Sequence, residues 1–219
     1  MDDSRVRAMY DRFSAIPWFW EVDAVTCRAT ARSPYRSRLI RDLGLDAASR
    51  VLDVACGTGL NFDLLHQAVG DSGRLVGVDN SPRTLQLARR RVGRQGWRNV
   101  DLVESDAAAY RPEERFDAAV CTFAIDIVPR WRETIDMMVG AVRPGGRVGF
   151  IGFTESSRSG FALLNPAWRA AAPWFGGEVG RPVRAQVRTL CDEVSYAEVF
   201  GGFYYLLVGT PRALPRRGA

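Results

Sequence analysis

A glycine-rich turn between a short apolar run and the start of a helix constrains the fold of this chain more than any other feature. Residues 51–62 read VLDVACGTGLNF, in which Gly57 and Gly59 separate the apolar run from a segment of helical spacing. Glycines at such a turn let the backbone bend tightly and approach a ligand without a Cβ in the way. The pattern therefore predicts a strand, a ligand-binding turn and a helix, in that order.

The same alternation continues to residue 153. We expect strands at 51–55, 75–78, 100–103, 116–123 and 147–153, and helices at 60–69, 82–94 and 135–142. Ser81 and Pro82 are typical of the cap and the first position of a helix. Strands that alternate with helices in this way predict an α/β fold with a doubly wound, mostly parallel sheet.

The two ends of the chain depart from this alternation. Residues 194–200 and 203–208 predict an antiparallel C-terminal hairpin around Gly201 and Gly202, which brings the sheet to seven strands. We expect an N-terminal helical cap at 1–49 and an α/β domain at 50–219. Within that domain, the aromatic-rich insertion at 154–190 is expected to cover the substrate.

Composition narrows the class of protein. The chain has 219 residues, of which 47% are hydrophobic and 25% charged, and this is ordinary globular usage. Its apolar runs are far shorter than the ~20 residues of a membrane span, and the N-terminus has no signal-peptide pattern. All 30 basic residues are arginines and are spread along the chain, which excludes a catalytic lysine and disfavours a nucleic-acid-binding stripe.

The cysteines and the single histidine bear on location and on metal binding. The four cysteines stand far apart without a CxxC pair, so we expect reduced thiols in a cytoplasmic protein. With His66 as the only histidine, we expect no metal site.

Three acidic residues lie at or near the ends of predicted strands. Asp53 lies near the end of the first strand, Asp79 ends the second, and Asp106 follows the third. Asp79 comes twenty positions after Gly59 and can accept hydrogen bonds from both hydroxyls of a ribose. Asp106 can accept one from an adenine amino group, and Asp53 suits a ligand with an ammonium group.

These residues leave two classes of ligand open. A dinucleotide also uses a glycine turn and a following acid, but the third glycine of that fingerprint is replaced here by Phe62. Asp53 would in addition repel a pyrophosphate. A nucleoside with an amino-acid tail agrees with both observations, and dinucleotide binding is the second interpretation.

Five segments in this order resemble the class I S-adenosylmethionine-dependent methyltransferases: VLDVACGTG, VGVDNSP, VESDAAA, FDAAVCTFA and VRPGGRVGF. The resemblance covers roughly residues 50–153 plus the hairpin, and it is greatest to the branch of the ubiquinone and menaquinone C-methyltransferases. It implies S-adenosylmethionine as the cofactor. It also implies a set of cofactor-binding residues, namely Tyr10, Asp53, Ala55, Gly57, Thr58, Gly59, Asp79, Asn80, Asp106, Ala107 and Thr122.

The resemblance assigns parts of the cofactor to these residues. The glycine turn would line the methionine, Asp79 the ribose, and Asp106 with Ala107 the adenine, while Tyr10 would close over the cofactor. Asn61 is a weaker candidate, since an asparagine follows the turn in similar lipid and thiol methyltransferases. Residues 18–20, Trp-Phe-Trp, are expected to form an apolar lid over the acceptor.

The chain departs from the quinone enzymes after the fourth strand. Their motif continues with an Arg-Asn pair, whereas this chain has Asp126 and Ile127. We therefore expect a different acceptor. Asp126 is the candidate catalytic residue, as a general base or as an acid that orients an amine or hydroxyl. The alternative is a helix cap or surface acid before Pro129.

Together these features predict an enzyme, a methyltransferase acting on a small, largely apolar acceptor such as a secondary metabolite or a quinone-like or lipid-like compound. The alternative is a methyltransferase-fold protein that catalyses a non-methylating reaction or only binds ligand. Nucleic-acid and protein methyltransferases and nicotinamide oxidoreductases are disfavoured. We expect a small-molecule partner, no nucleic acid and no integral membrane segment, and the sequence leaves a homodimer open.

Overall fold

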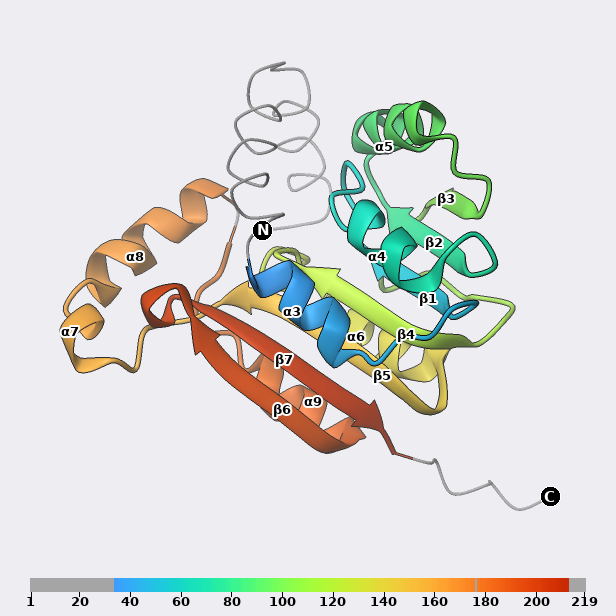
Figure 1. The fold of residues 1–219 in the computed structure, drawn as a ribbon. Coiled ribbons are helices and arrows are strands. Elements are labelled where there is room, and N and C mark those ends of the chain that lie inside the picture. Colours follow the sequence, from blue (N-terminus) through green and yellow to red (C-terminus); the bar gives the residue numbers. More distant parts are fainter. Residues whose placement is uncertain (1–33, 176, 213–219) are drawn as a thin grey trace.

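The computed structural model describes residues 34–175 and 177–212, which form a seven-stranded sheet with helices on both faces (Figure 1). The strands lie in the order β3-β2-β1-β4-β5-β7-β6. Their bounds are β1 Arg50–Val54, β2 Arg74–Asp79, β3 Val100–Glu104, β4 Phe116–Thr122, β5 Val142–Phe153, β6 Cys191–Val199 and β7 Tyr204–Pro211.

The helices of this part of the chain fall into two sets. The helices that flank the sheet are α3 Pro34–Asp42, α4 Phe62–Val69, α5 Pro82–Gln95, α6 Trp131–Ala141 and α9 Val183–Leu190. Shorter helical segments lie between β5 and α9 and between the last two strands: α7 Ser159–Ala162, α8 Asn165–Ala171, η1 Ala172–Phe175 and η2 Phe200–Gly202.

The strand directions confirm the expected fold class. Strands β1 to β5 pair in parallel, and β7 pairs antiparallel with both β5 and β6. The first strand has β2 on one side and β4 on the other, so the strand order reverses beside β1. In open α/β sheets, ligands bind at the carboxyl ends of the strands at such a point. The glycine turn leaves β1 there.

Successive residues of the strands are buried against opposite layers of helices. Val51 packs in the layer of α3 and α4 with Leu39 and Leu65. Leu52 packs in the layer of α6 and α9 with Ile135. Because side chains alternate across a strand, the apolar run of β1 serves both faces, as expected for a strand covered on both sides.

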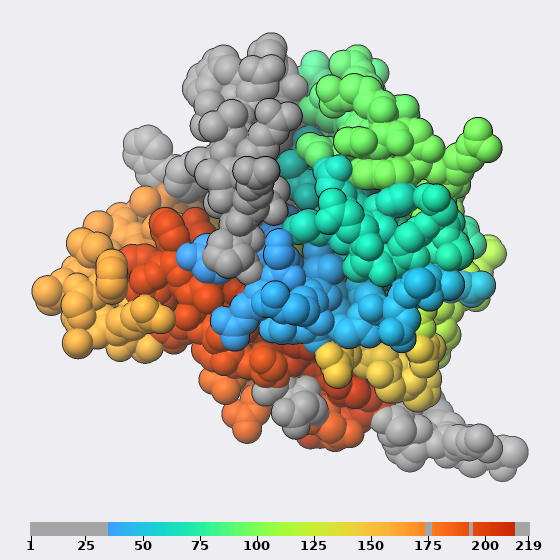
Figure 2. Space-filling view, viewed as in Figure 1, coloured from blue at the N-terminus to red at the C-terminus, as the bar shows by residue number. Residues whose placement is uncertain are grey.

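The insertion at 154–190 contains more regular structure than its sequence suggested. It holds α7, α8, η1 and α9. Helices α7 and α8 lie at the end of the molecule away from α5 (Figure 2). Of the expected cap at 1–49, the structure describes α3 and the segment that leads to β1. In residues 34–175 and 177–212, no helix is both long and apolar enough to cross a bilayer.

Candidate active site

The glycine turn after β1 has left-handed backbone at three positions. Ala55, Gly57 and Gly59 have φ angles of 53°, 56° and 76°. A Cβ on Gly57 would meet no atom within 4 Å, so open space lies in front of this residue. A Cβ on Gly59 would lie 2.5 Å from the ring of Phe62, so Gly59 makes room for that buried ring. The two glycines therefore serve different purposes.

Asp79 connects the end of β2 to the glycine turn. Its Oδ2 accepts a 2.9 Å hydrogen bond from the backbone N–H of Gly57. Its Oδ1 accepts from the N–H of Ser81 at 2.9 Å and from the hydroxyl of Thr84 at 3.1 Å. Burial raises the pKa of Asp79, and the hydrogen bonds from Ser81 and Gly57 oppose that rise. Each carboxylate oxygen has two lone-pair sites, so Oδ2 can accept a further donor such as a ribose hydroxyl.

Asp53 lies at the centre of a buried polar network. The side-chain amide of Asn61 donates to both of its carboxylate oxygens, at 3.0 and 3.1 Å. The same amide nitrogen lies 3.0 Å from the hydroxyl of Thr122 at the end of β4. Arg36 of α3 donates from Nη1 to the Asn61 side-chain oxygen and, at 2.7 Å, to Thr122. We call Arg36, Asp53, Asn61 and Thr122 the donor-side network.

The carboxylate of Asp53 is poorly stabilised as an anion. Asp53 is 1% exposed. Burial raises its pKa to about 7, against the opposing effects of the Asn61 hydrogen bond and the positive charge of Arg36. A cationic ligand group nearby would favour the ionised form and lower this pKa. The binding of an ammonium group beside Asp53 stays a prediction.

Asp106 closes a turn after β3. Its Oδ1 accepts a 2.9 Å hydrogen bond from the N–H of Ala109 and lies 3.8 Å from Nη1 of Arg130. The neighbouring Ala107 is 8% exposed. Three more of the predicted cofactor residues lie in the turn after β1 and next to the end of β2: Thr58 is buried, and Ala55 and Asn80 are half-buried.

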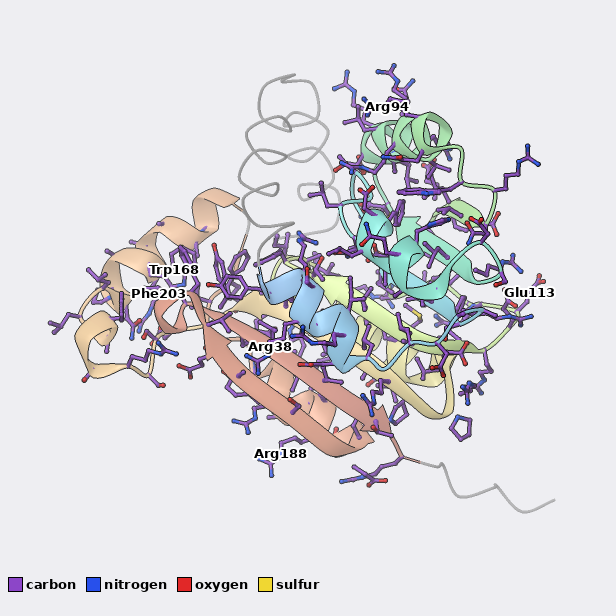
Figure 3. The ribbon with its side chains drawn as sticks, in the orientation of Figure 1. Arg38, Arg94, Glu113, Trp168, Arg188 and Phe203 are labelled. Carbon is purple, nitrogen blue, oxygen red and sulfur yellow. The ribbon has the colours of Figure 1, made fainter. Side chains whose placement is uncertain are left out.

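Aromatic side chains gather where β4 and β5 end and β7 begins. The ring of Phe123 lies 5.7 Å from that of Phe153 and 5.2 Å from that of Tyr204. Trp168 continues the row, 5.9 Å from Phe153 and 5.6 Å from Phe203. Figure 3 shows Trp168 and Phe203 together beside α8. We call Phe123, Phe153, Trp168, Phe203 and Tyr204 the aromatic wall.

Asp126 is buried, so the alternative interpretation of this residue, as a surface acid or a helix cap, is wrong. Its exposed fraction is 0%. Oδ2 accepts a 2.8 Å hydrogen bond from the N–H of Phe153 and lies 3.5 Å from the hydroxyl of Tyr205. Burial raises the pKa of Asp126 to about 7, which the Phe153 hydrogen bond and the charge of Arg181 oppose. The structure shows no acceptor-facing surface on this side chain, and its catalytic role stays a prediction.

The structure brings together some predicted residues and not others. Near the turn after β1, Gly57 contacts Asp79, and Asp53 and Thr122 are connected through the amide of Asn61. Asp126 instead contacts β5 and β7. Tyr10 and the expected lid at residues 18–20 lie outside the described residues. So does Cys27, whereas Cys56, Cys121 and Cys191 are free, buried thiols. No cluster of metal-ligating side chains occurs within 34–175 and 177–212.

Arg36 and most of the aromatic wall were not identified from the sequence as parts of the site; Trp168 lies in the insertion at 154–190 that was expected to cover the substrate. Arg36 could have been noticed, because it shares a helical face with Leu39, Ile40 and Leu43, which are buried. An arginine at a core-facing position of an amphipathic helix signals a buried charge. The wall has no such pattern, since its members come from four separate segments.

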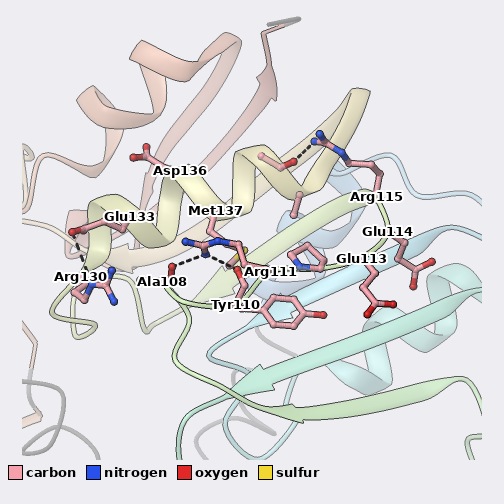
Figure 4. A pocket seen from close by; sticks show the side chains of 13 residues that line it. Ala108, Tyr110, Arg111, Glu113, Glu114, Arg115, Arg130, Glu133, Asp136 and Met137 are labelled. Carbon is pink, nitrogen blue, oxygen red and sulfur yellow. Dashed lines mark hydrogen bonds and ion pairs between the residues drawn. The ribbon is translucent and has the colours of Figure 1, made fainter.

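A surface pocket of about 550 Å³ lies elsewhere, between α6 and the segment that joins β3 to β4 (Figure 4). Its lining contains arginines and acids, but the arginines are engaged by the chain. Arg111 donates to the carbonyl of Ala108 at 2.9 Å, and Arg115 donates to that of Gly140. None of the predicted site residues lines this pocket.

The sequence of this chain is similar to those of known methyltransferases. A family model described as a methyltransferase domain matches residues 51–146. The demethylmenaquinone methyltransferase of Anoxybacillus flavithermus is 29% identical over 144 residues, which are 65% of this chain and 61% of that protein. The chain thus spans about three fifths of the length of the curated relatives that it matches.

Solved structures share the fold at low sequence identity. The N-methyltransferase NodS from Bradyrhizobium japonicum, crystallised with S-adenosyl-L-homocysteine, has a TM-score of 0.69 and 19% identity, covering 95% of this chain and 99% of its own. The [4+2]-cyclase SpnF has a TM-score of 0.63 and 16% identity, covering 80% of this chain and 79% of its own. At these identities the likeness concerns the fold alone.

Proposed function

We propose that this chain, a class I S-adenosylmethionine-dependent methyltransferase by its sequence and its fold, transfers a methyl group to a small, largely apolar acceptor. Two features support a methyl-donor site at the turn after β1. The space before Gly57 is open, and Asp79 and Asp53 offer carboxylates suited to a ribose and an ammonium group. S-adenosylmethionine, when bound, supplies a methyl group already activated on a sulfonium.

The observation that carries the proposal is the junction of Thr122 and Phe123. The hydroxyl of Thr122 belongs to the donor-side network. The next side chain, Phe123, belongs to the aromatic wall. A single peptide bond therefore connects a polar, nucleoside-compatible environment to an apolar one. An acceptor packed on the wall would lie beside the donor.

The chain's own contribution to such a reaction is positioning. Displacement at an activated methyl needs an aligned acceptor and an environment that excludes water. The aromatic wall offers apolar surface for holding an acceptor, and its members are half-buried at the edge of the core. Many methyl transfers need little more than this, so the proposal assigns no proton transfer to a particular side chain of the wall.

The acceptor is proposed to differ from that of the quinone enzymes. At the positions where their motif has an Arg-Asn pair, Asp126 and Ile127 are 0% and 6% exposed. Neither side chain offers a group to a ligand in this arrangement. The apolar character of the wall supports a lipid-like or aromatic acceptor over a strongly polar one.

Calorimetry with the purified chain tests the cofactor first. We expect binding of S-adenosylmethionine and S-adenosylhomocysteine and negligible binding of NAD; the reverse pattern would reject the assignment. A panel of hydroxylated naphthalenes, prenylated quinols and fatty acids is then incubated with methyl-labelled donor, and labelled product is counted in the organic extract.

The variant Phe153→Leu distinguishes the wall from the donor side. We expect it to raise the KM for an apolar acceptor while leaving the affinity for S-adenosylhomocysteine unchanged, because Phe153 contacts the wall and not the donor-side network. If the chain binds the adenosyl ligands but transfers no label to any acceptor, a non-methylating role of this fold becomes the better interpretation.

A further inference from the structure

Four large apolar side chains are exposed on the insertion between β5 and α9 and on the turn before β7. In the described part of the chain, Leu163 is 84% exposed, and Phe161, Leu164 and Phe200 are 45%, 52% and 55% exposed. The N–H of Leu164 donates to the carbonyl of Phe161 at 2.9 Å, so these two residues share one turn. A Cβ added at Gly201 would lie 3.0 Å from the ring of Phe161, which therefore packs beside the turn that carries Phe200. We call Phe161, Leu163, Leu164 and Phe200 the exposed patch, and such a group of side chains marks an interaction surface.

The exposed patch continues into the aromatic wall. The ring of Phe161 lies 6.2 Å from that of Phe203. Phe200 stacks on Tyr204, with ring centroids 4.7 Å apart and 13° between the ring planes. Figure 2 shows α7 and α8, in orange, at the end of the molecule away from α5. The apolar surface of the wall therefore extends to the outside of the molecule.

The charge beside the exposed patch is positive. Residues 156–177 contain two arginines and no acidic residue. The carbonyl of Arg158 accepts from the N–H groups of Phe161 and Ala162 at 2.9 and 2.8 Å, so this arginine lies one turn before the patch. Arg158 is exposed, and within residues 34–175 and 177–212 its guanidinium forms no ion pair. The other arginine, Arg169, is paired with Glu155 at 2.6 Å.

We propose that the exposed patch binds the surface of a phospholipid bilayer that contains anionic lipids. At such a surface, apolar side chains enter the boundary between headgroups and acyl chains, and basic side chains attract the anionic headgroups. The exposed patch supplies the first contribution and Arg158 the second. The choice of a bilayer over a protein partner rests on the proposed function, because the aromatic wall, on which an apolar acceptor would pack, adjoins the patch. An acceptor dissolved in the bilayer would then reach the wall without crossing water.

Flotation of the full chain with lipid vesicles tests this proposal without a methyl donor or an acceptor. Wild type should float with vesicles of phosphatidylcholine mixed with phosphatidylglycerol, and more weakly with vesicles of phosphatidylcholine alone. Leu163→Gln should lower the partition into both kinds of vesicle by about 10-fold, because the apolar side chain that enters the lipid is lost. Since Leu163 is exposed, this variant should keep the wild-type melting temperature.

A pair of arginine variants tests the contribution of charge. Arg158→Gln should lower the partition into the mixed vesicles by about 5-fold and leave the partition into phosphatidylcholine unchanged. Arg188→Gln is the matched control, because it removes the same charge from an exposed position on α9 (Figure 3). Helix α9 ends where β6 begins, whereas Phe200 follows the other end of β6. This control should therefore float as wild type does.

Each other outcome has a definite meaning. If wild type floats with neither kind of vesicle, or if Leu163→Gln floats as well as wild type, the proposal is wrong. Equal losses in the two arginine variants assign the attraction to the net charge of the chain and overturn it as well. A wild-type dimer that does not float and that Leu163→Gln converts to a monomer in size-exclusion chromatography makes the patch an interface between two copies instead. If Leu163→Gln does not fold, Leu164→Gln takes its place. Flotation that depends on Leu163, without methyl transfer to any acceptor, refutes the proposed function alone.

Discussion

The carboxylate of Asp126 accepts its hydrogen bond from the backbone N–H of Phe153, and this contact joins the loop after β4 to the end of β5. The second oxygen, Oδ1, is buried without a partner among the described residues. Asp126 therefore holds the backbone of Phe153, a residue of the aromatic wall, in place. If it affects methyl transfer, the structure favours an effect through the position of Phe153.

The pH dependence of stability should report this buried acid. Asp126 has a pKa of about 7 in the folded chain against 3.8 for an unperturbed carboxyl. Between about pH 4 and 7 the folded chain holds a proton that the unfolded chain has released, so stability falls as pH rises. Asp126→Asn should make this fall shallower in thermal melts followed by circular dichroism. Some slope remains, because Asp53 is shifted in the same direction.

The control for that measurement is Asp136→Asn, which changes an exposed acid on α6. Its melting temperature should follow the wild-type pH profile. A profile of Asp126→Asn with the wild-type slope would show that protonation of Asp126 does not contribute to stability.

Gly152 should be intolerant of a methyl group. A Cβ there would lie 2.1 Å from Oδ2 of Asp126 and 2.4 Å from the hydroxyl of Tyr205. Overpacking of a core typically costs about 1–3 kcal/mol. We therefore expect Gly152→Ala to lower the free energy of unfolding by about 3 kcal/mol, the upper end of this range. Gly140→Ala is the matched control, because a Cβ added at Gly140 would meet no atom within 4 Å and alanine is favoured over glycine in a helix. Equal urea midpoints for the two variants would contradict the packing described.

Gly57→Ala should weaken adenosyl binding beyond its effect on stability. The new methyl group would enter the open space before the turn. Gly96→Ala introduces the same strain of a positive φ, 71° against 56°, in a second open position far along the chain at the end of α5. Both variants should lose comparable stability, about 1 kcal/mol. Titration with S-adenosylhomocysteine should separate them, and equal affinities would argue against a ligand at Gly57.

Asp79→Asn should reduce the affinity for S-adenosylhomocysteine by about 10-fold or more, since an unpaired buried polar partner costs roughly 1–3 kcal/mol. The loss combines a weaker ribose contact with a disturbed hydrogen bond to Gly57. Asp101→Asn on the neighbouring strand β3 removes an exposed acid paired with Arg74 and should leave binding unchanged. Full affinity in Asp79→Asn would refute the ribose assignment.

Much of the fold could be predicted because its elements are encoded locally. The apolar run of β1 and the Ser81 cap of α5, whose side chain accepts from the N–H of Thr84, behave as their sequences indicate. Asp53 and Asp79 could also be identified from the sequence as candidate site residues, since each lies close to the end of a predicted strand.

The remaining parts of the site depend on contacts between distant segments. Arg36 meets Thr122 across 86 positions, and Asp126 is buried because Gly152 leaves space for its carboxylate. The helical face of Arg36 signals that its charge is buried, but no local pattern identifies Thr122 or Gly152 as the partner residue. The sequence could name Asp126 as a chemical candidate, but the direction of its side chain depends on β5 and β7.

The junction at Thr122 and Phe123 divides the chain into an earlier and a later portion. The donor-side network is drawn from residues 36–122, and apart from Phe123 the aromatic wall comes from residues 153–204. Under the proposed function, exchange of the later portion changes the acceptor preference and leaves the donor-side network intact. A chimera that joins this chain's first half to the corresponding end of a relative should keep the nucleoside ligand and adopt the relative's acceptor.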